Sequence, residues 1–143
     1  MIVSNTSPLI ALDHLGELDL IPRVLGSGIV IPPAVEHEFG AGRLPDWIEI
    51  GPRVLQASLG AGESEALALA LEAGADLILL DDKAARRLAA ALRQPFMGTL
   101  GFLLKAKEAG LIGEIRPKIE ALRALPFHIA PRLYEAVLKA AQE

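Results

Sequence analysis

Residues 77–87 read LILLDDKAARR, and this stretch decides the class of fold. Its first four residues form an apolar run that is too short and too uniform for a surface helix, which favours a strand buried on both faces of a parallel sheet. Asp81 and Asp82 end this strand, and the residues that follow have the pattern of a helix from about 84 to 93. We therefore expect a central strand that is followed directly by acidic residues and a helix.

Strand and helix patterns alternate on both sides of this stretch, which is typical of α/β proteins. Further strands are expected at residues 1–3, 28–31 and 95–97, with a weak one at 47–50 or 54–55. Further helices are expected from Ser7-Pro8 onward, at 32–39, 63–73 and 99–109, and in two segments that Pro126 and Pro131 interrupt. The pattern predicts one domain over residues 1–143, with a parallel sheet of four or five strands covered on both faces and a helical C-terminal extension from about residue 126.

Composition and charge narrow the class of protein. Apolar residues make up 52% of the chain and charged residues 22%, which predicts one well-packed core. The formal net charge of -4 argues against nucleic-acid binding through bulk positive charge, so any such contact must come from a local patch. The absence of cysteine excludes disulfides and thiolate metal sites, and there is no signal-peptide pattern or membrane-spanning apolar run. We expect a cytoplasmic protein that does not enter a membrane.

Polar residues follow three of the predicted strands. Asn5 and Thr6 follow the first strand, Asp81 and Asp82 follow the central one, and Thr99 follows the next. Ligands of open parallel sheets bind outside the carboxyl ends of the strands, so these residues are expected at one edge. Acids on the predicted helices could reach the same edge, at Glu36, Glu38, Glu63 and Glu65.

Each of these residues also has a local structural explanation. Asn5 can hydrogen-bond its own turn, and Asp81 or Asp82 and Thr99 can cap the helices that follow them. Acids at positions 63 and 65 suit the positive end of a helix dipole. Separate strand ends converge in space whereas separate caps need not, so the cluster favours a functional site over five unrelated caps.

The motifs that are absent restrict the chemistry of such a site. The chain has no GxxxxGK[ST] phosphate loop, no GxGxxG turn, no GxSxG elbow and no HExxH zinc motif. Carboxylates without histidine or cysteine ligands favour an oxygen-seeking cation such as Mg²⁺ or Mn²⁺. Such a cation can polarise a phosphodiester and lower the pKa of an attacking water, so the residues predict a metal-dependent phosphodiesterase.

Five motifs in order carry a resemblance to a known family: VSNTSPLI at 3–10, IPPAVEHEF at 31–39, GESEALALA at 62–70, LILLDDKAARR at 77–87 and GTLGFLLKAKEAGLI at 98–112. Together they resemble the PIN-domain superfamily, in the branch of prokaryotic PIN-like proteins related to toxin–antitoxin ribonucleases. The likeness extends from residue 1 to about residue 125. It implies a three-layer α/β/α sandwich and the cleavage of single-stranded RNA with Mg²⁺ or Mn²⁺.

The resemblance also implies the metal ligands by position. It places them at Glu38, Glu63 and Asp81, with Glu65 and Asp82 as alternates. Asn5 stands where the family usually has an aspartate, so the first strand offers a neutral amide in place of a charge. Since metal affinity depends on the charge of the ligands, we expect this substitution to weaken metal binding, although an amide can still coordinate Mg²⁺ or orient its water.

Four residues near the expected site are candidates for contact with the RNA: Thr6, Arg86, Arg87 and Thr99. Arg86 and Arg87 follow the aspartate pair by one helical turn, so at least one of them can face the site and bind a phosphate. The alternative is that they lie on a solvated helix face and pair with acids.

The first hypothesis is a divalent-metal-dependent ribonuclease of the toxin type, with an antitoxin that covers the pocket. The alternative is a PIN-like fold that has lost catalysis through Asn5 and serves as an RNA-binding or protein-interaction module. A homodimer is expected in either case.

Overall fold

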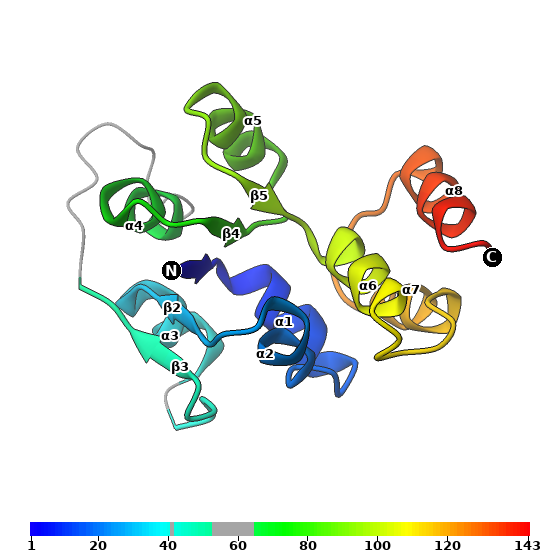
Figure 1. The fold of residues 1–143 in the computed structure, drawn as a ribbon, viewed down its shortest axis with the longest axis horizontal. Coiled ribbons are helices and arrows are strands. Elements are labelled where there is room, and N and C mark those ends of the chain that lie inside the picture. Colours follow the sequence, from blue (N-terminus) through cyan, green and yellow to red (C-terminus); the bar gives the residue numbers. More distant parts are fainter. Residues whose placement is uncertain (41, 53–64) are drawn as a thin grey trace.

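A computed structural model describes residues 1–40, 42–52 and 65–143 and contains a sheet of five parallel strands (Figure 1). The strands are β1 (Ile2–Ser4), β2 (Ile29–Ile31), β3 (Ile48–Ile50), β4 (Leu77–Leu79) and β5 (Phe96–Met97). Their order in the sheet is β3-β2-β1-β4-β5. The predicted parallel sheet is confirmed, and its weakest strand forms at the first of the two stretches considered. The second stretch, 54–55, lies outside the described residues.

Eight helices occur in the described part of the chain, and none there has both the length and the apolar character needed to cross a membrane. They are α1 (Thr6–His14), α2 (Leu20–Leu25), α3 (Pro33–Phe39), α4 (Glu65–Ala73), α5 (Lys83–Ala91), α6 (Thr99–Glu108), α7 (Arg116–Leu122) and α8 (Pro131–Ala140). The last two helices confirm the helical C-terminus.

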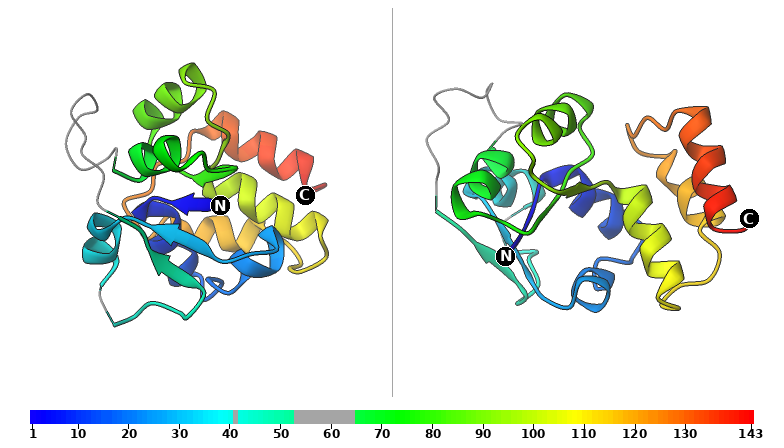
Figure 2. Two further views of the ribbon diagram at one scale, coloured as in Figure 1. Left: turned by 60° about the vertical axis from the view of Figure 1, so that its left-hand side comes forward. Right: turned by 45° about the horizontal axis from the view of Figure 1, so that its top comes forward.

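The helices lie in two layers because the chain winds in two directions. From β1 it moves through β2 to β3, then crosses to β4 and moves outward to β5. Right-handed crossovers in opposite directions place their helices on opposite faces of a sheet. Accordingly α4 packs on β1 and β4 and α5 on β5, whereas α1 contacts α3 and α6. The left view of Figure 2 shows α4 and α5 above the strands and α1 and α2 below them, which confirms the three-layer α/β/α sandwich.

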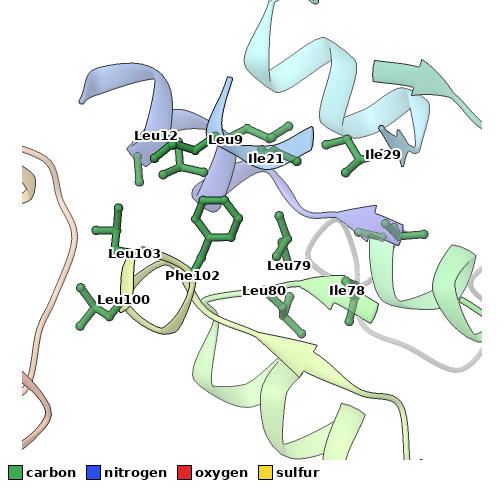
Figure 3. Packing of buried hydrophobic residues seen from close by; sticks show 14 of the residues in the cluster. Leu9, Leu12, Ile21, Ile29, Ile78, Leu79, Leu80, Leu100, Phe102 and Leu103 are labelled. Atoms are coloured by element: carbon green, nitrogen blue, oxygen red, sulfur yellow. The ribbon is translucent and has the colours of Figure 1, made fainter. Parts of the chain in front are cut away.

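Phe102 of α6 lies in the core between the sheet and the helix layer that contains α1. Figure 3 shows the Phe102 ring directed toward Leu9 of α1, with Leu79 of β4 beside it. All three side chains are fully buried. Burial of an apolar side chain of this size contributes about 1.5–3 kcal/mol, so this contact fixes where α6 begins relative to β4.

Two helix predictions differ from the structure. Helix α1 begins at Thr6 rather than at Ser7-Pro8, because Asn5 keeps an extended backbone and donates its N–H to the carbonyl oxygen of Leu79 at 2.9 Å. Helix α2 was not predicted, since Pro22 lies within it. Pro22 is the third residue of that helix, where the missing N–H needs no partner within the helix.

Glu143 joins the last three helices. Its carboxylate accepts hydrogen bonds from the N–H groups of Ile115 at 2.8 Å and Arg116 at 3.1 Å, and from Lys107 Nζ at 2.8 Å. Loss of water around the carboxylate raises its pKa, but the bonds from Ile115, Lys107 and Arg116 outweigh this effect and lower the pKa to about 2. Glu143 thus supplies the N-terminal cap that Ile115 does not provide for α7.

Candidate active site

The chain adds strands in one direction from β1 to β3 and in the other direction from β4 to β5. The junction of β1 and β4 is therefore the switch point of the sheet, and it defines the candidate site. Ser4 of β1 is paired with Leu79 of β4, and the N–H of Asn5 continues the ladder to Leu79. The register therefore places Asn5 and Thr6 beside Leu80 and Asp81. In open parallel sheets the crevice at such a switch point is where ligands bind.

Asp81 lies at this edge and is held by Thr99. The N–H of Thr99 donates to Oδ1 of Asp81 at 2.8 Å, and the Thr99 hydroxyl donates to Oδ2 at 2.6 Å. The two residues meet because β4 and β5 are paired up to Leu80, whose N–H donates to the carbonyl of Met97 at 2.9 Å. Both oxygens of the carboxylate are thereby oriented, and each retains a lone pair for a further ligand.

The carboxyl group of Asp81 is partly dehydrated. Burial raises the pKa of Asp81, and the two hydrogen bonds from Thr99 and the charge of Arg86 lower it by less. The ionised form is therefore only partly compensated by the surrounding protein. A carboxylate with a raised pKa at the carboxyl end of a strand is a candidate functional position, and a bound cation would stabilise its ionised form.

Arg86 of α5 lies near this carboxylate without forming an ion pair with it, and its guanidinium rests on Phe96 of β5. The guanidinium carbon lies 5.3 Å from the centroid of the Phe96 ring. Gly98 leaves room for both groups, since a Cβ at this position would lie 3.0 Å from Asp81 Oδ1 and 3.7 Å from the guanidinium of Arg86. Arg87, the neighbouring arginine of α5, is exposed. Of the two arginines considered, Arg86 is the one beside Asp81.

Asn5 and Thr6 present polar groups that local structure does not use. Asn5 is the N-cap residue of α1, yet its side chain makes no capping hydrogen bond. Thr6 is 5% exposed, and its hydroxyl is buried without a hydrogen-bond partner in the described part of the chain. Buried polar groups are almost always paired, so a Thr6 hydroxyl without a partner among the described residues is an unusual feature of this edge.

Asp82, in contrast, has a local role. It is the N-cap residue of α5, and its Oδ2 accepts a hydrogen bond from the N–H of Ala85 at 2.7 Å. The local explanation offered for one of the two aspartates therefore applies to Asp82. One of its oxygens is committed to the helix, which makes it a weaker candidate for a metal ligand than Asp81.

The remaining acids are not gathered around Asp81 in the described residues. Glu38 is exposed on α3, whose buried side is formed by Val35 and Phe39. Glu65 begins α4, and Glu63 lies outside the described residues. Across residues 1–40, 42–52 and 65–143, no three acidic or histidine side chains are close enough together to hold a metal ion. The convergence of Glu38, Glu63 and Asp81 on one cation stays a prediction.

Helix α4 nevertheless brings its first residue toward the same edge. The helix packs on β1 and β4 and returns to β4 through a short turn after Gly74, so it runs antiparallel to the strands. Its nine residues span about 13 Å, which is slightly more than a three-residue strand. Partly buried Glu65 therefore lies near the level of the carboxyl ends of the strands.

The donor set at this edge suits a hard cation. Its members are all oxygens: the Asp81 carboxylate, the Asn5 amide and the hydroxyls of Thr6 and Thr99. Mg²⁺ and Mn²⁺ prefer such ligands, and the Thr6 hydroxyl has no hydrogen-bond partner among the described residues. Helices α1 and α6 also begin here, and their N-terminal ends favour negatively charged ligands. The groups at this edge are of the chemical types that bind a divalent cation and a phosphate.

Sequence reasoning did not single out two residues of this edge. Phe96 supports Arg86, and Gly98 admits both Arg86 and Asp81. The sequence signal for Gly98 is its position between a strand and a helix, where a side chain would block the crevice. Phe96 carries no such signal, because which face of a two-residue strand lies under α5 depends on the fold.

Comparison with known proteins identifies one family. A family model described as a PIN domain matches residues 1–143, the whole sequence given. No curated protein matches the chain. No solved structure matches it either.

Proposed function

This chain belongs to the PIN-domain family, whose members are generally nucleases, and from that premise we propose that it is a divalent-metal-dependent ribonuclease that hydrolyses single-stranded RNA. The observation that carries the proposal is the position of Asp81. It is a partly dehydrated carboxylate at the switch point of the sheet, oriented through both oxygens by Thr99. Asp81 also caps α6 through the N–H of Thr99, and the proposal adds a bound cation to this structural role.

The proposed cofactor is Mg²⁺ or Mn²⁺, with Asp81 as its central ligand. Glu38 and Glu63 complete the proposed ligand set. Glu65 is a better alternate ligand than Asp82, because one oxygen of Asp82 caps α5. The cation would polarise the phosphodiester and lower the pKa of the attacking water.

The other polar groups of the edge have supporting roles in this proposal. Thr99 fixes the rotation of the Asp81 carboxylate, so its oxygens face the crevice before a cation binds. Asn5, free of capping duty, supplies a neutral oxygen to the cation or to its water. The first turns of α1 and α6 receive phosphate oxygens through their free N–H groups.

A toxin role, an antitoxin that covers the carboxyl edge and a homodimer extend the same proposal. They follow from the family resemblance of the five sequence motifs. The edge between β1 and β4 is where an inhibitory partner would have to bind, since that position would exclude RNA from Asp81.

Asn5 favours a second candidate function, a PIN-like module that binds RNA or protein without cutting it. The usual aspartate of the first strand is replaced by a neutral amide, which lowers the charge available to a cation. Asn5→Asp separates the two candidates. Cleavage that appears only in this variant identifies the native protein as a binding module, whereas cleavage by both proteins identifies a nuclease.

The direct test is RNA cleavage by wild type and Asp81→Asn. Asparagine at position 81 can still accept the Thr99 N–H through Oδ1 and donate its amide to the Thr99 hydroxyl, so the fold is retained. We expect Mn²⁺-dependent cleavage by wild type, its loss with a chelator, and a fall of at least about 100-fold in Asp81→Asn. Asp46→Asn, at an exposed position before β3, is the matched control. Equal rates for the two variants would contradict the proposal.

A further inference from the structure

Arg86 is fixed in place before any ligand arrives. Its backbone belongs to α5, its guanidinium lies over the Phe96 ring of β5, and the backbone of Gly98 passes beside it. An arginine side chain loses about 2 kcal/mol of rotamer entropy when it is immobilised, and here the packing has already compensated for that loss. A group held in this way is suited to binding a ligand at low entropic cost.

The N–H donors of the Arg86 guanidinium are not occupied by an ion pair among the described residues. Its charge acts on Asp81, but no carboxylate among the described residues lies within ion-pair distance of Arg86. The planar guanidinium carries five N–H donors, and the Phe96 ring engages its face rather than these donors. The edge of the guanidinium is therefore available to a planar or bidentate acceptor such as a phosphate.

The charges on the two sides of the candidate site are asymmetric. Beyond Asp81 and Asp82, the α5 side carries Lys83, Arg86 and Arg87, whereas the α3 side carries Glu36 and Glu38. The chain as a whole is acidic, so a local group of basic residues favours contact with a phosphate backbone at this place. This group lies on α5, next to Phe96 and Gly98.

We propose that the RNA backbone crosses the site on the α5–β5 side, with Arg86 binding the phosphate next to Asp81 and Phe96 acting as the positioning residue for Arg86. This inference rests on the proposed ribonuclease function and specifies where the substrate lies. Arg86 contacts the phosphate in both the bound state and the reaction, so its loss acts mainly on KM. Phe96 acts only through Arg86.

The test measures Mn²⁺ affinity by calorimetry, and KM and kcat on a single-stranded oligouridylate. For Arg86→Ala we expect KM to rise about tenfold or more, with a smaller change in kcat. Mn²⁺ affinity should stay the same or increase, because a positive charge beside Asp81 has been removed. A purely structural role would instead lower metal affinity and thermal stability together.

Four further variants complete the design. Arg86→Lys should recover part of the KM loss, since the charge returns without the planar fork. Phe96→Leu should raise KM by less than Arg86→Ala, and the double variant should be no worse than Arg86→Ala alone. Arg23→Ala, an equal loss of charge on exposed α2, should change neither constant.

The outcomes separate this inference from the function on which it rests. If wild type neither binds Mn²⁺ nor cleaves RNA, the proposed function fails and the inference fails with it. If wild type cleaves in an Asp81-dependent manner but Arg86→Ala has an unchanged KM, the function stands and the path of the RNA is wrong. Additive effects of Arg86→Ala and Phe96→Leu on KM would overturn the role of Phe96.

Discussion

Thr99 holds the carboxylate of Asp81 through both of its oxygens, with its N–H 2.8 Å from Oδ1 and its hydroxyl 2.6 Å from Oδ2. The residues are 18 positions apart and come from the ends of two neighbouring strands. Since one residue supplies both donors, the carboxylate cannot rotate without breaking a bond. Asp81 is consequently oriented by the fold itself.

Thr99→Val tests this relationship. The substitution keeps the shape and the backbone N–H but removes the hydroxyl donor, so we expect a loss of about 1.5–3 kcal/mol in the free energy of unfolding, measured by urea denaturation. The pKa of Asp81, followed by carboxyl NMR, should rise further.

Thr6→Val is the matched control, because the Thr6 hydroxyl is also buried but has no partner in the part of the chain that the structure describes. Removal of an unpaired buried hydroxyl should leave stability unchanged or increase it. A loss equal to that of Thr99→Val would contradict the assignment of the two hydroxyls.

The raised pKa of Asp81 predicts a pH-dependent cost in stability. Because burial raises the pKa of the folded state above the ordinary 3.8, the ionised carboxylate destabilises the fold at neutral pH. Asp81→Asn should therefore be more stable than wild type at pH 7, and this advantage should disappear as the pH falls toward 3.8. Thermal unfolding across this pH range measures the difference. An Asp81→Asn variant that is less stable than wild type at pH 7 would show that the carboxylate is fully compensated.

The lowered pKa of Glu143 predicts the opposite pH dependence of the free energy of unfolding. Its pKa is lowered to about 2, so the ionised form stabilises the fold above the ordinary value of 4.5, and this contribution is lost as the pH falls from 4.5 toward 2. At pH 7, Glu143→Gln should cost about 1–3 kcal/mol, since three hydrogen bonds lose their charged acceptor. Glu135→Gln, on the exposed side of α8, should have little effect. A Glu143→Gln cost that persists at pH 2 would contradict the charge-based account.

Replacement of Arg93 by glycine is expected to stabilise the fold. It follows α5 with a φ of 58°, a left-handed conformation that normally favours glycine at a helix end. Arg93→Gly should increase the free energy of unfolding by about 0.5–1 kcal/mol. Arg93→Ala removes the same charge but keeps a Cβ, so it should bring no such gain. Equal effects of the two variants would assign the change to charge rather than to backbone strain.

The sequence predicts the parallel sheet well because its central strands, β1 and β4, are largely buried. LILL at 77–80 has no polar side to suggest a surface helix, and its strand forms at 77–79. The order of the strands was not predictable in the same way. The pairing of β1 with β4 joins segments separated by about 70 residues that contain two other strands, and only the packed fold determines it.

Part of the candidate site could likewise be predicted from the sequence, and part depends on the packed fold. The rule that strand ends share an edge was enough to expect Asp81 and Thr99 together. Which aspartate caps α5, and which arginine faces the crevice, depends on helix rotation and on contacts with β5. Asp82, Arg86 and Phe96 acquire their roles only from that packing.

The location of the cation is the most direct test of the central claim. Mn²⁺ broadens NMR signals of nearby nuclei, so a titration followed through the backbone amides maps its binding site. We predict that the amides of Thr6, Asp81 and Thr99 broaden at the lowest Mn²⁺ concentrations, and that Asp81→Asn removes this effect. Early broadening confined to other acidic surfaces, or a pattern that Asp81→Asn does not alter, would contradict a metal site at the junction of β1 and β4.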